Sequence, residues 1–116
     1  DNHVDFSGSI TNAVEKTKDY LAKHHLHLKI EVETRNMHEV KEALAANVDF
    51  IMLDNFDLET MKEAVLYING QTETEASGGI TKESVRAIAE TGVDFISSGA
   101  IIHSAKNFDL SLKAIK

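Results

Sequence analysis

The chain contains no cysteine, no proline and no tryptophan. Without cysteine it can form no disulfide, thiolate nucleophile or zinc–thiolate site, so we expect a cytoplasmic location. Loops normally contain some proline. Its absence, together with a start at Asp1 rather than at methionine, leads us to expect a fragment of a longer protein. No apolar run approaches the roughly 18 residues of a membrane span, so we expect no membrane partner.

Positive charge is also scarce, because 12 Lys and Arg residues face 19 Asp and Glu residues, for a net charge of −7. Binding to the nucleic-acid backbone needs a basic surface, so we expect no nucleic-acid partner. A length of 116 residues suits one compact domain. A complete (β/α)8 barrel needs roughly 250 residues, so the chain could hold about half of one.

Four times, an apolar run ends in polar or glycine residues and a helical pattern follows. Glu33, Asp54, Ser77 and Gly99 mark these junctions, which makes the spacings 21, 23 and 22 residues. Strand and helix patterns that repeat at this interval predict parallel βα units in an α/β fold. Ligands of such sheets bind at the carboxyl ends of the strands, so the junctions also predict a site.

Hydrophobic periodicity predicts the individual elements. Helices are expected at about 10–23, 36–46, 57–68, 81–91 and from 103 onward, and strands at 26–33, 50–53, 72–76 and 94–97. Asn36, with Glu39 three residues later, resembles a capping box, and Asp57 can cap the next helix. Asn47 and Gly92 each end a helix directly before a strand, where a left-handed conformation is expected. These four strands and their helices form one predicted domain over residues 1–116.

Three carboxylates lie at the ends of the first two predicted strands. Glu31 and Glu33 share one face because side chains alternate along a strand, and Asp54 ends the next strand. Such groups could hold a hydrated Mg²⁺, bind ribose hydroxyls or stabilise a developing cation. The alternatives are a solvated strand face for the glutamates and a helix cap for Asp54, although Asp57 is better placed to cap.

Two glycine-containing junctions follow the last two strands. The first consists of Ser77, Gly78 and Gly79, and the second of Ser98, Gly99 and Ala100. Each could aim backbone N–H groups at an anion, or be only a turn. Two such junctions in succession match the phosphate site of many barrels. His103, at the start of the last predicted helix, could donate to a phosphate oxygen or be a half-exposed cap.

Six motifs, read together and in order, resemble the quinolinate phosphoribosyltransferase family, also called carboxylating nicotinate-nucleotide pyrophosphorylase. They are Asp1-Asn2-His3, Ile30-Glu31-Val32-Glu33, Ile51-Met52-Leu53-Asp54-Asn55, Glu75-Ala76-Ser77-Gly78-Gly79-Ile80, Glu90-Thr91-Gly92-Val93-Asp94 and Gly99-Ala100 with His103-Ser104. The resemblance covers essentially the whole chain. It implies an N-terminal α/β domain, absent here, followed by an incomplete TIM-like barrel. It also implies a transferase that joins quinolinate to phosphoribosyl pyrophosphate with Mg²⁺, giving nicotinate mononucleotide, CO₂ and pyrophosphate for NAD biosynthesis.

The resemblance also implies roles for single residues. Glu33 and Asp54 resemble the family carboxylates near the ribose and the metal. The Ser77–Gly79 and Ser98–Ala100 segments resemble two phosphate-binding loops, and His103 resembles a histidine lining the same pocket. The family's quinolinate-binding arginines and lysines come mostly from outside this chain and partly from a partner subunit. We therefore expect a homo-oligomer, a dimer or larger, and an isolated chain without activity.

Two other functions stay open at this point. The chain could belong to a paralogous phosphoribosyltransferase that uses another ring acid. It could also be a non-catalytic phosphate-binding half barrel or a stable proteolytic core. Strand edges left open in such a core would favour self-association.

Overall fold

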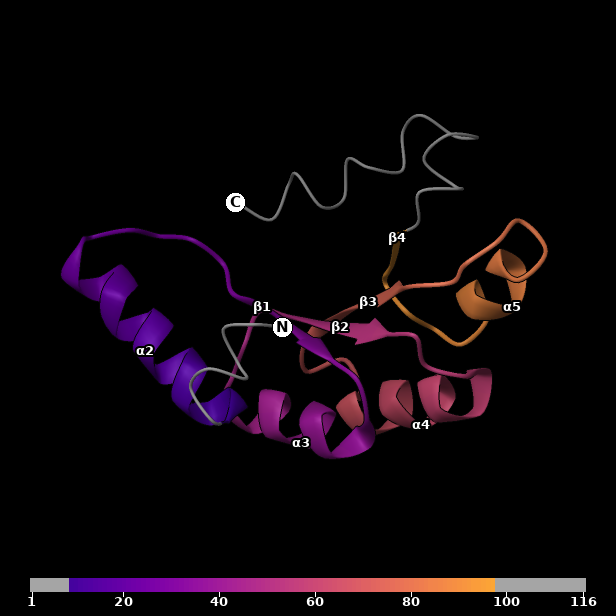
Figure 1. Cartoon of the computed structure of the whole chain (residues 1–116), viewed down its shortest axis with the longest axis horizontal. Helices are drawn as coiled ribbons and strands as arrows, with labels where there is room; N and C mark the ends of the chain where they lie inside the picture. The colour runs from indigo at the N-terminus through magenta and orange to yellow at the C-terminus, as the bar shows by residue number, and fades with distance from the viewer. Residues whose placement is uncertain (1–8, 98–116) are drawn as a thin grey trace.

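The computed structural model describes residues 9–97 and shows parallel β-strands alternating with α-helices (Figure 1). The strands are β1 (Glu31–Thr34), β2 (Phe50–Asp54), β3 (Glu73–Ser77) and β4 (Phe95–Ser97), and the helices are α2 (Ile10–Lys23), α3 (Met37–Ala45), α4 (Leu58–Ile68) and α5 (Val85–Ala89). The sheet order is β1-β2-β3-β4, and all neighbours are parallel. Each strand pairs with the next one along the chain, as in an α/β barrel, whereas a doubly wound sheet reverses its order. The predicted parallel α/β fold is confirmed.

The helices cover one face of the sheet. Figure 1 shows α3 and α4 side by side beneath the strands. The strand residues that face them are buried and share one hydrophobic cluster with both helices; among them are Val32, Ile51, Leu53 and Ala76 of the strands, Val40 and Ala43 of α3, and Met61 and Ala64 of α4. Burying this apolar area is the main stabilising contribution to the fold.

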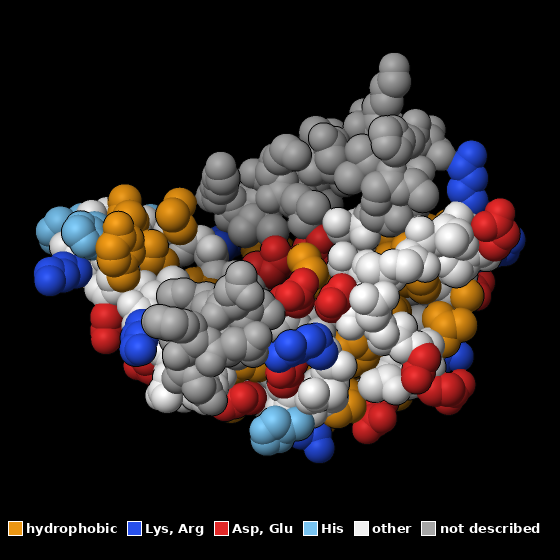
Figure 2. All heavy atoms as spheres, viewed as in Figure 1, with side chains coloured by type: hydrophobic (Ala, Val, Ile, Leu, Met, Phe, Trp, Pro, Cys, Tyr) orange, Lys and Arg blue, Asp and Glu red, His pale blue; other side chains and the backbone are white. Residues whose placement is uncertain are grey.

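The opposite face of the sheet is acidic. The register assigns to it the alternate residues Glu31, Glu33, Phe50, Met52, Asp54, Glu73, Glu75, Ser77, Phe95 and Ser97. Figure 2 shows acidic side chains gathered around a hydrophobic one over the region where Figure 1 places β1 to β3. The helices therefore pack on one face of the sheet, and the carboxylates lie on the opposite face.

Two elements begin several residues later than predicted. The first strand begins at Glu31 rather than at Leu26, because pairing with β2 begins where Ile30 O accepts the amides of Asp49 and Phe50, at 2.9 and 3.1 Å. The fourth helix begins at Val85 rather than at Thr81. Thr81 and Ser84 exchange backbone-to-hydroxyl bonds of 3.0 and 3.2 Å, and this closes a turn before the regular helix. The helix predicted from 103 onward lies outside the described residues.

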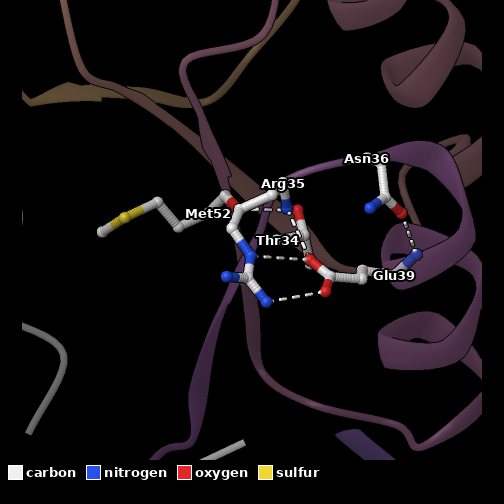
Figure 3. A network of polar contacts seen from close by, with 5 residues as sticks. All are labelled: Thr34, Arg35, Asn36, Glu39 and Met52. Atoms are coloured by element: carbon white, nitrogen blue, oxygen red, sulfur yellow. Dashed lines mark hydrogen bonds and ion pairs between the residues drawn. The ribbon is translucent and has the colours of Figure 1, made fainter. Parts of the chain in front are cut away.

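A polar network anchors the start of α3 to the end of β1 (Figure 3). Asn36 Oδ1 accepts the amide of Glu39 at 2.9 Å, as the capping prediction required. The Glu39 carboxylate reaches back to the amide of Arg35 at 2.7 Å, one residue earlier than in a regular capping box. Burial of Glu39 opposes its ionisation, but the hydrogen bonds and charge of Arg35 outweigh burial and lower the pKa of Glu39. The loop that follows β1 is thus held at both ends.

Replacing Asn36 by alanine is expected to destabilise the chain by about 1 kcal/mol, because the amide of Glu39 loses its acceptor. The free energy of unfolding, measured by urea titration of the 116-residue chain, tests this. Asn36→Asp is the matched control, since its carboxylate keeps the acceptor. Equal stabilities of the alanine and aspartate variants would contradict the capping role.

Within residues 9–97, no helix is both long enough and apolar enough to cross a membrane.

Candidate functional site

The carboxyl ends of the strands bring the predicted site residues to one edge of the sheet. Asp54 of β2 lies directly across from Ser77 of β3, which in turn lies across from Ser97 of β4. Glu33 of β1 faces the same side, opposite Met52, two residues before Asp54. Strand spacing and rise put the Cα atoms of Glu33 and Asp54 about 8 Å apart. Both side chains are half-buried, and the register brings Glu33, Asp54 and Ser77 to the same end and face of the sheet.

A double-glycine turn follows β3 at this edge. Gly78 and Gly79 have φ angles of +87° and +61°, in the left-handed region that L-residues with a side chain rarely adopt. The turn lies beside the end of β2, because Asn55 N donates to Ser77 O at 2.9 Å. The predicted Ser77–Gly79 turn therefore directly adjoins Asp54. The helix after it, α5, has only five residues and begins at Val85, so the turn itself must supply any backbone donors.

Two carboxyl groups lie deeper on the same face. Glu75 of β3 is 1% exposed and is hydrogen-bonded to Glu31 of β1 and to Ser97 of β4. Burial, followed by the hydrogen bond and the charge of Glu31, raises the pKa of Glu75 to about 8, although the Ser97 bond opposes this. The Oε2 atoms of Glu31 and Glu75 are buried without a hydrogen-bond partner in the part of the chain that the structure describes. Glu75 therefore keeps its proton near neutral pH.

A cavity of about 450 Å³, lined by eight of the residues between 18 and 30 together with Asn47 and Asp49, lies elsewhere. Asn47 and Asp49 precede β2, so this cavity opens at the amino ends of the strands. Parallel α/β sheets bind their ligands at the carboxyl ends. We therefore place the candidate site at Glu33, Asp54 and Ser77, where the polar residues gather, and not at this cavity.

The donor set at the carboxyl ends suits a hard cation only in part. Among residues 9–97, no group of three or more His, Cys, Asp or Glu side chains could by itself hold a metal ion. Glu33 and Asp54 are two carboxylates on one face of adjacent strands. Mg²⁺ is commonly held by one or two carboxylates together with substrate phosphates and water, so the residues present fit that mode of binding.

The structure also shows what the sequence patterns missed. Asn55, directly after β2, has a φ of +58° and packs its carboxamide against Gly78. The sequence places Glu75 only within a weak strand, yet it is the most buried carboxyl group on the acidic face. Its alternation with Ser77 along β3 is the signal that could have revealed it. The second predicted phosphate loop (Ser98, Gly99 and Ala100) and His103 lie outside the described residues.

This arrangement defines a class: a parallel α/β protein whose strands follow the sequential order of a barrel, with polar residues gathered at their carboxyl ends. The model of the family described as "Quinolinate phosphoribosyl transferase, C-terminal domain" matches residues 1–113. The chain belongs to this family.

Individual proteins and a solved structure that resemble this chain carry the names of the same family. The chain is 45% identical over 128 residues to the chloroplastic carboxylating nicotinate-nucleotide pyrophosphorylase of Arabidopsis thaliana, covering 97% of this chain and 37% of the relative. It is 46% identical to a probable carboxylating nicotinate-nucleotide pyrophosphorylase of Synechocystis, covering 100% of this chain and 39% of that one. The nicotinate-nucleotide pyrophosphorylase structure from Francisella tularensis superposes with a TM-score of 0.79 at 44% identity, covering 87% of this chain and 35% of that one. The chain thus spans a little over one third of the length of its relatives.

Proposed function

We propose that this chain is the ribose-phosphate side of a quinolinate phosphoribosyltransferase. The reaction joins quinolinate to phosphoribosyl pyrophosphate and releases nicotinate mononucleotide, CO₂ and pyrophosphate. The observation that carries the proposal is the shared edge at which Glu33, Asp54 and the Ser77–Gly79 turn meet. The complete enzyme consists of this chain joined to the N-terminal remainder that its relatives have.

The charges of the site favour the transition state over the substrates. Both substrates are polyanions, whereas Glu33 and Asp54 make this edge acidic. As the bond to pyrophosphate breaks, the ribose becomes cationic, and fixed carboxylates stabilise that charge more than they stabilise the ground state. The 5′-phosphate needs donors, and the backbone N–H groups of the Ser77–Gly79 turn are available for it. Each part of the edge therefore suits a different part of one sugar phosphate.

The reaction also requires cations to bring the anions to this edge. Glu33 and Asp54 would hold Mg²⁺ together with the pyrophosphate of the substrate. When bound, the ion offsets the charge of the leaving group. Arginines and lysines from the N-terminal remainder would bind the two carboxylates of quinolinate. Removing Mg²⁺ from the complete enzyme with a chelator is expected to abolish turnover, and excess Mg²⁺ should restore it; turnover that survives chelation would contradict the metal requirement.

The function is tested by assaying nicotinate mononucleotide and pyrophosphate formation. The complete enzyme is expected to turn over with quinolinate and not with nicotinate. The 116-residue chain alone is expected to form no product, because it lacks the basic residues for quinolinate. Turnover by the isolated chain would overturn this division of the site, and a complete enzyme that ignores quinolinate would overturn the function.

We further propose a cytoplasmic location and self-association into a dimer or a larger oligomer. The names of several plant relatives place them in the chloroplast or the mitochondrion, whereas those of two Nicotiana relatives and of the Synechocystis relative state no compartment. Cell fractionation tests the location. Light scattering of the complete enzyme tests the assembly, and a purely monomeric species would contradict it.

A further inference from the structure

The carboxamide of Asn55 fills the space above the double-glycine turn. A Cβ atom placed on Gly78 would lie 2.8 Å from both Cγ and Oδ1 of Asn55 and 2.9 Å from its Nδ2. A Cβ atom on Gly79 would lie 3.3 Å from the same Oδ1. All three heavy atoms of the amide group are therefore in contact range of the place that a side chain at residue 78 would occupy. One residue thus packs against both glycines of the turn.

The backbone of Asn55 is attached to the same segment. Its N–H donates to Ser77 O at 2.9 Å, so the end of β2 and the end of β3 are joined directly before the turn begins. Asn55 itself has a φ of +58°, a conformation that asparagine tolerates better than most residues do. This conformation follows Asp54 immediately. The side chain that packs on the turn and the carboxylate of the site thus belong to consecutive residues at the end of β2.

The turn depends on contacts from outside because its two glycines have no side chains that could fix its shape. Gly78 and Gly79 have no side chains and adopt consecutive left-handed φ angles of +87° and +61°. Glycine loses the most conformational entropy on ordering, so an unsupported pair would sample many other shapes. Backbone donors bind an anion tightly only when their direction is fixed before binding. A contact that fixes the turn therefore favours phosphate binding.

We propose that Asn55 is a positioning residue that holds the Ser77–Gly79 turn in the shape that binds the phosphate of phosphoribosyl pyrophosphate. This inference rests on the proposed function. It assigns to the asparagine after β2 the task of linking the carboxylate end of the site to the phosphate end. The side chain acts through the turn and is not assigned a contact with the substrate.

The kinetic test separates the side chain of Asn55 from its backbone conformation. Asn55→Gly keeps the left-handed backbone accessible and removes the side chain with its carboxamide. In the complete enzyme we expect the KM for phosphoribosyl pyrophosphate to rise about tenfold, with the KM for quinolinate changed less than about twofold. The matched control is Asn69→Gly, because Asn69 is also a left-handed asparagine, with a φ of +50°, but it ends α4 before the amino end of β3, whereas the turn follows the carboxyl end of that strand. An Asn55→Gly enzyme with the kinetics of Asn69→Gly would overturn the proposal.

A second test requires no activity. In the 116-residue chain, Gly78→Ala should destabilise more while Asn55 is present, because the new methyl group meets the carboxamide at 2.8 Å and Asn55 must shift away from the turn. In the Asn55→Gly background only the backbone strain at residue 78 remains, so the loss in melting temperature should be clearly smaller. Equal losses in the two backgrounds would show that Asn55 does not determine what the turn accommodates, which also overturns the proposal.

The two failures can be told apart. If the complete wild-type enzyme does not turn over quinolinate, the proposed function fails. Calorimetric titration with phosphoribosyl pyrophosphate then still decides the role of Asn55. An affinity that falls in Asn55→Gly but not in Asn69→Gly supports the positioning role, and equal affinities overturn it.

Discussion

Replacing Glu33 by glutamine, or Asp54 by asparagine, is expected to lower the kcat of the complete enzyme by roughly 10²–10³-fold. Each substitution keeps the size of the side chain and removes its negative charge. Both carboxylates lie at the edge where the ribose is proposed to become cationic, on adjacent strands and the same face of the sheet. The charge is needed most in the transition state, so kcat should fall more than the KM for phosphoribosyl pyrophosphate rises. Steady-state kinetics with both substrates varied would measure this.

The matched control for these variants is Glu63→Gln, which removes one charge from an exposed position on α4. It should leave both kcat and KM near the wild-type values, because a surface charge is largely screened from the site. A pattern in which Glu33→Gln raises KM but leaves kcat unchanged would contradict transition-state stabilisation. It would instead assign Glu33 to ground-state binding of the ribose hydroxyls.

Local chemistry explains why most of the fold is predictable from the sequence. Asn47 and Gly92 are expected to be left-handed before strands, and their φ angles are +58° and +97°. Asp57 is expected to cap α4, and its Oδ1 accepts the amide of Thr60 at 2.7 Å. This bond lowers the pKa of Asp57. Because Asp57 is the cap of α4, Asp54 is the last residue of β2 and not a helix cap. Such signals are encoded within three or four residues.

The prediction failed where the outcome depends on a distant partner. The alternating residues Leu26, Leu28 and Ile30 resemble a strand, yet Leu26 and Leu28 are 42% and 49% exposed. Pairing with β2 begins only at Ile30, and the sequence pattern does not contain that register. Dependence on distant partners also limits what the sequence predicts of the site. Strand order put Glu33, Asp54 and Ser77 at one edge, but the contact between Asn55 and Gly78 joins segments 23 residues apart in the printed sequence.

The pKa of Glu75 also depends on a residue that is distant in the sequence, Glu31. Glu31 lies on β1 and Glu75 on β3, with β2 between them, and their carboxyl groups are hydrogen-bonded. Burial, followed by the hydrogen bond and the charge of Glu31, disfavours a second negative charge here, so Glu75 keeps its proton. A glutamate in water has an ordinary pKa of 4.5, and this environment raises the pKa of Glu75 to about 8. Folding is therefore linked to proton binding at this position.

This linkage predicts that the free energy of unfolding falls as pH rises. Below pH 4.5 both the folded and the unfolded chain hold the proton of Glu75, so its contribution does not change. Between about 4.5 and about 8 only the folded chain holds it, so stability declines as the pH increases. Above about 8 both states have released the proton and the loss is complete. Urea titrations of the 116-residue chain at about pH 5, 7 and 9, which span this range, would measure the decline.

Glu75→Gln should remove most of this decline, because glutamine stays neutral and its amide can still donate to Glu31. The variant is therefore expected to be more stable than the wild type at about pH 9, where the wild-type pair carries two charges. Glu73→Gln is the matched control, since Glu73 lies on the same strand and face but is exposed. It should keep the wild-type pH profile. Parallel profiles for the wild type and Glu75→Gln between about pH 5 and 9 would show that the buried proton resides elsewhere, because only an ionising Glu75 links that decline to the pair.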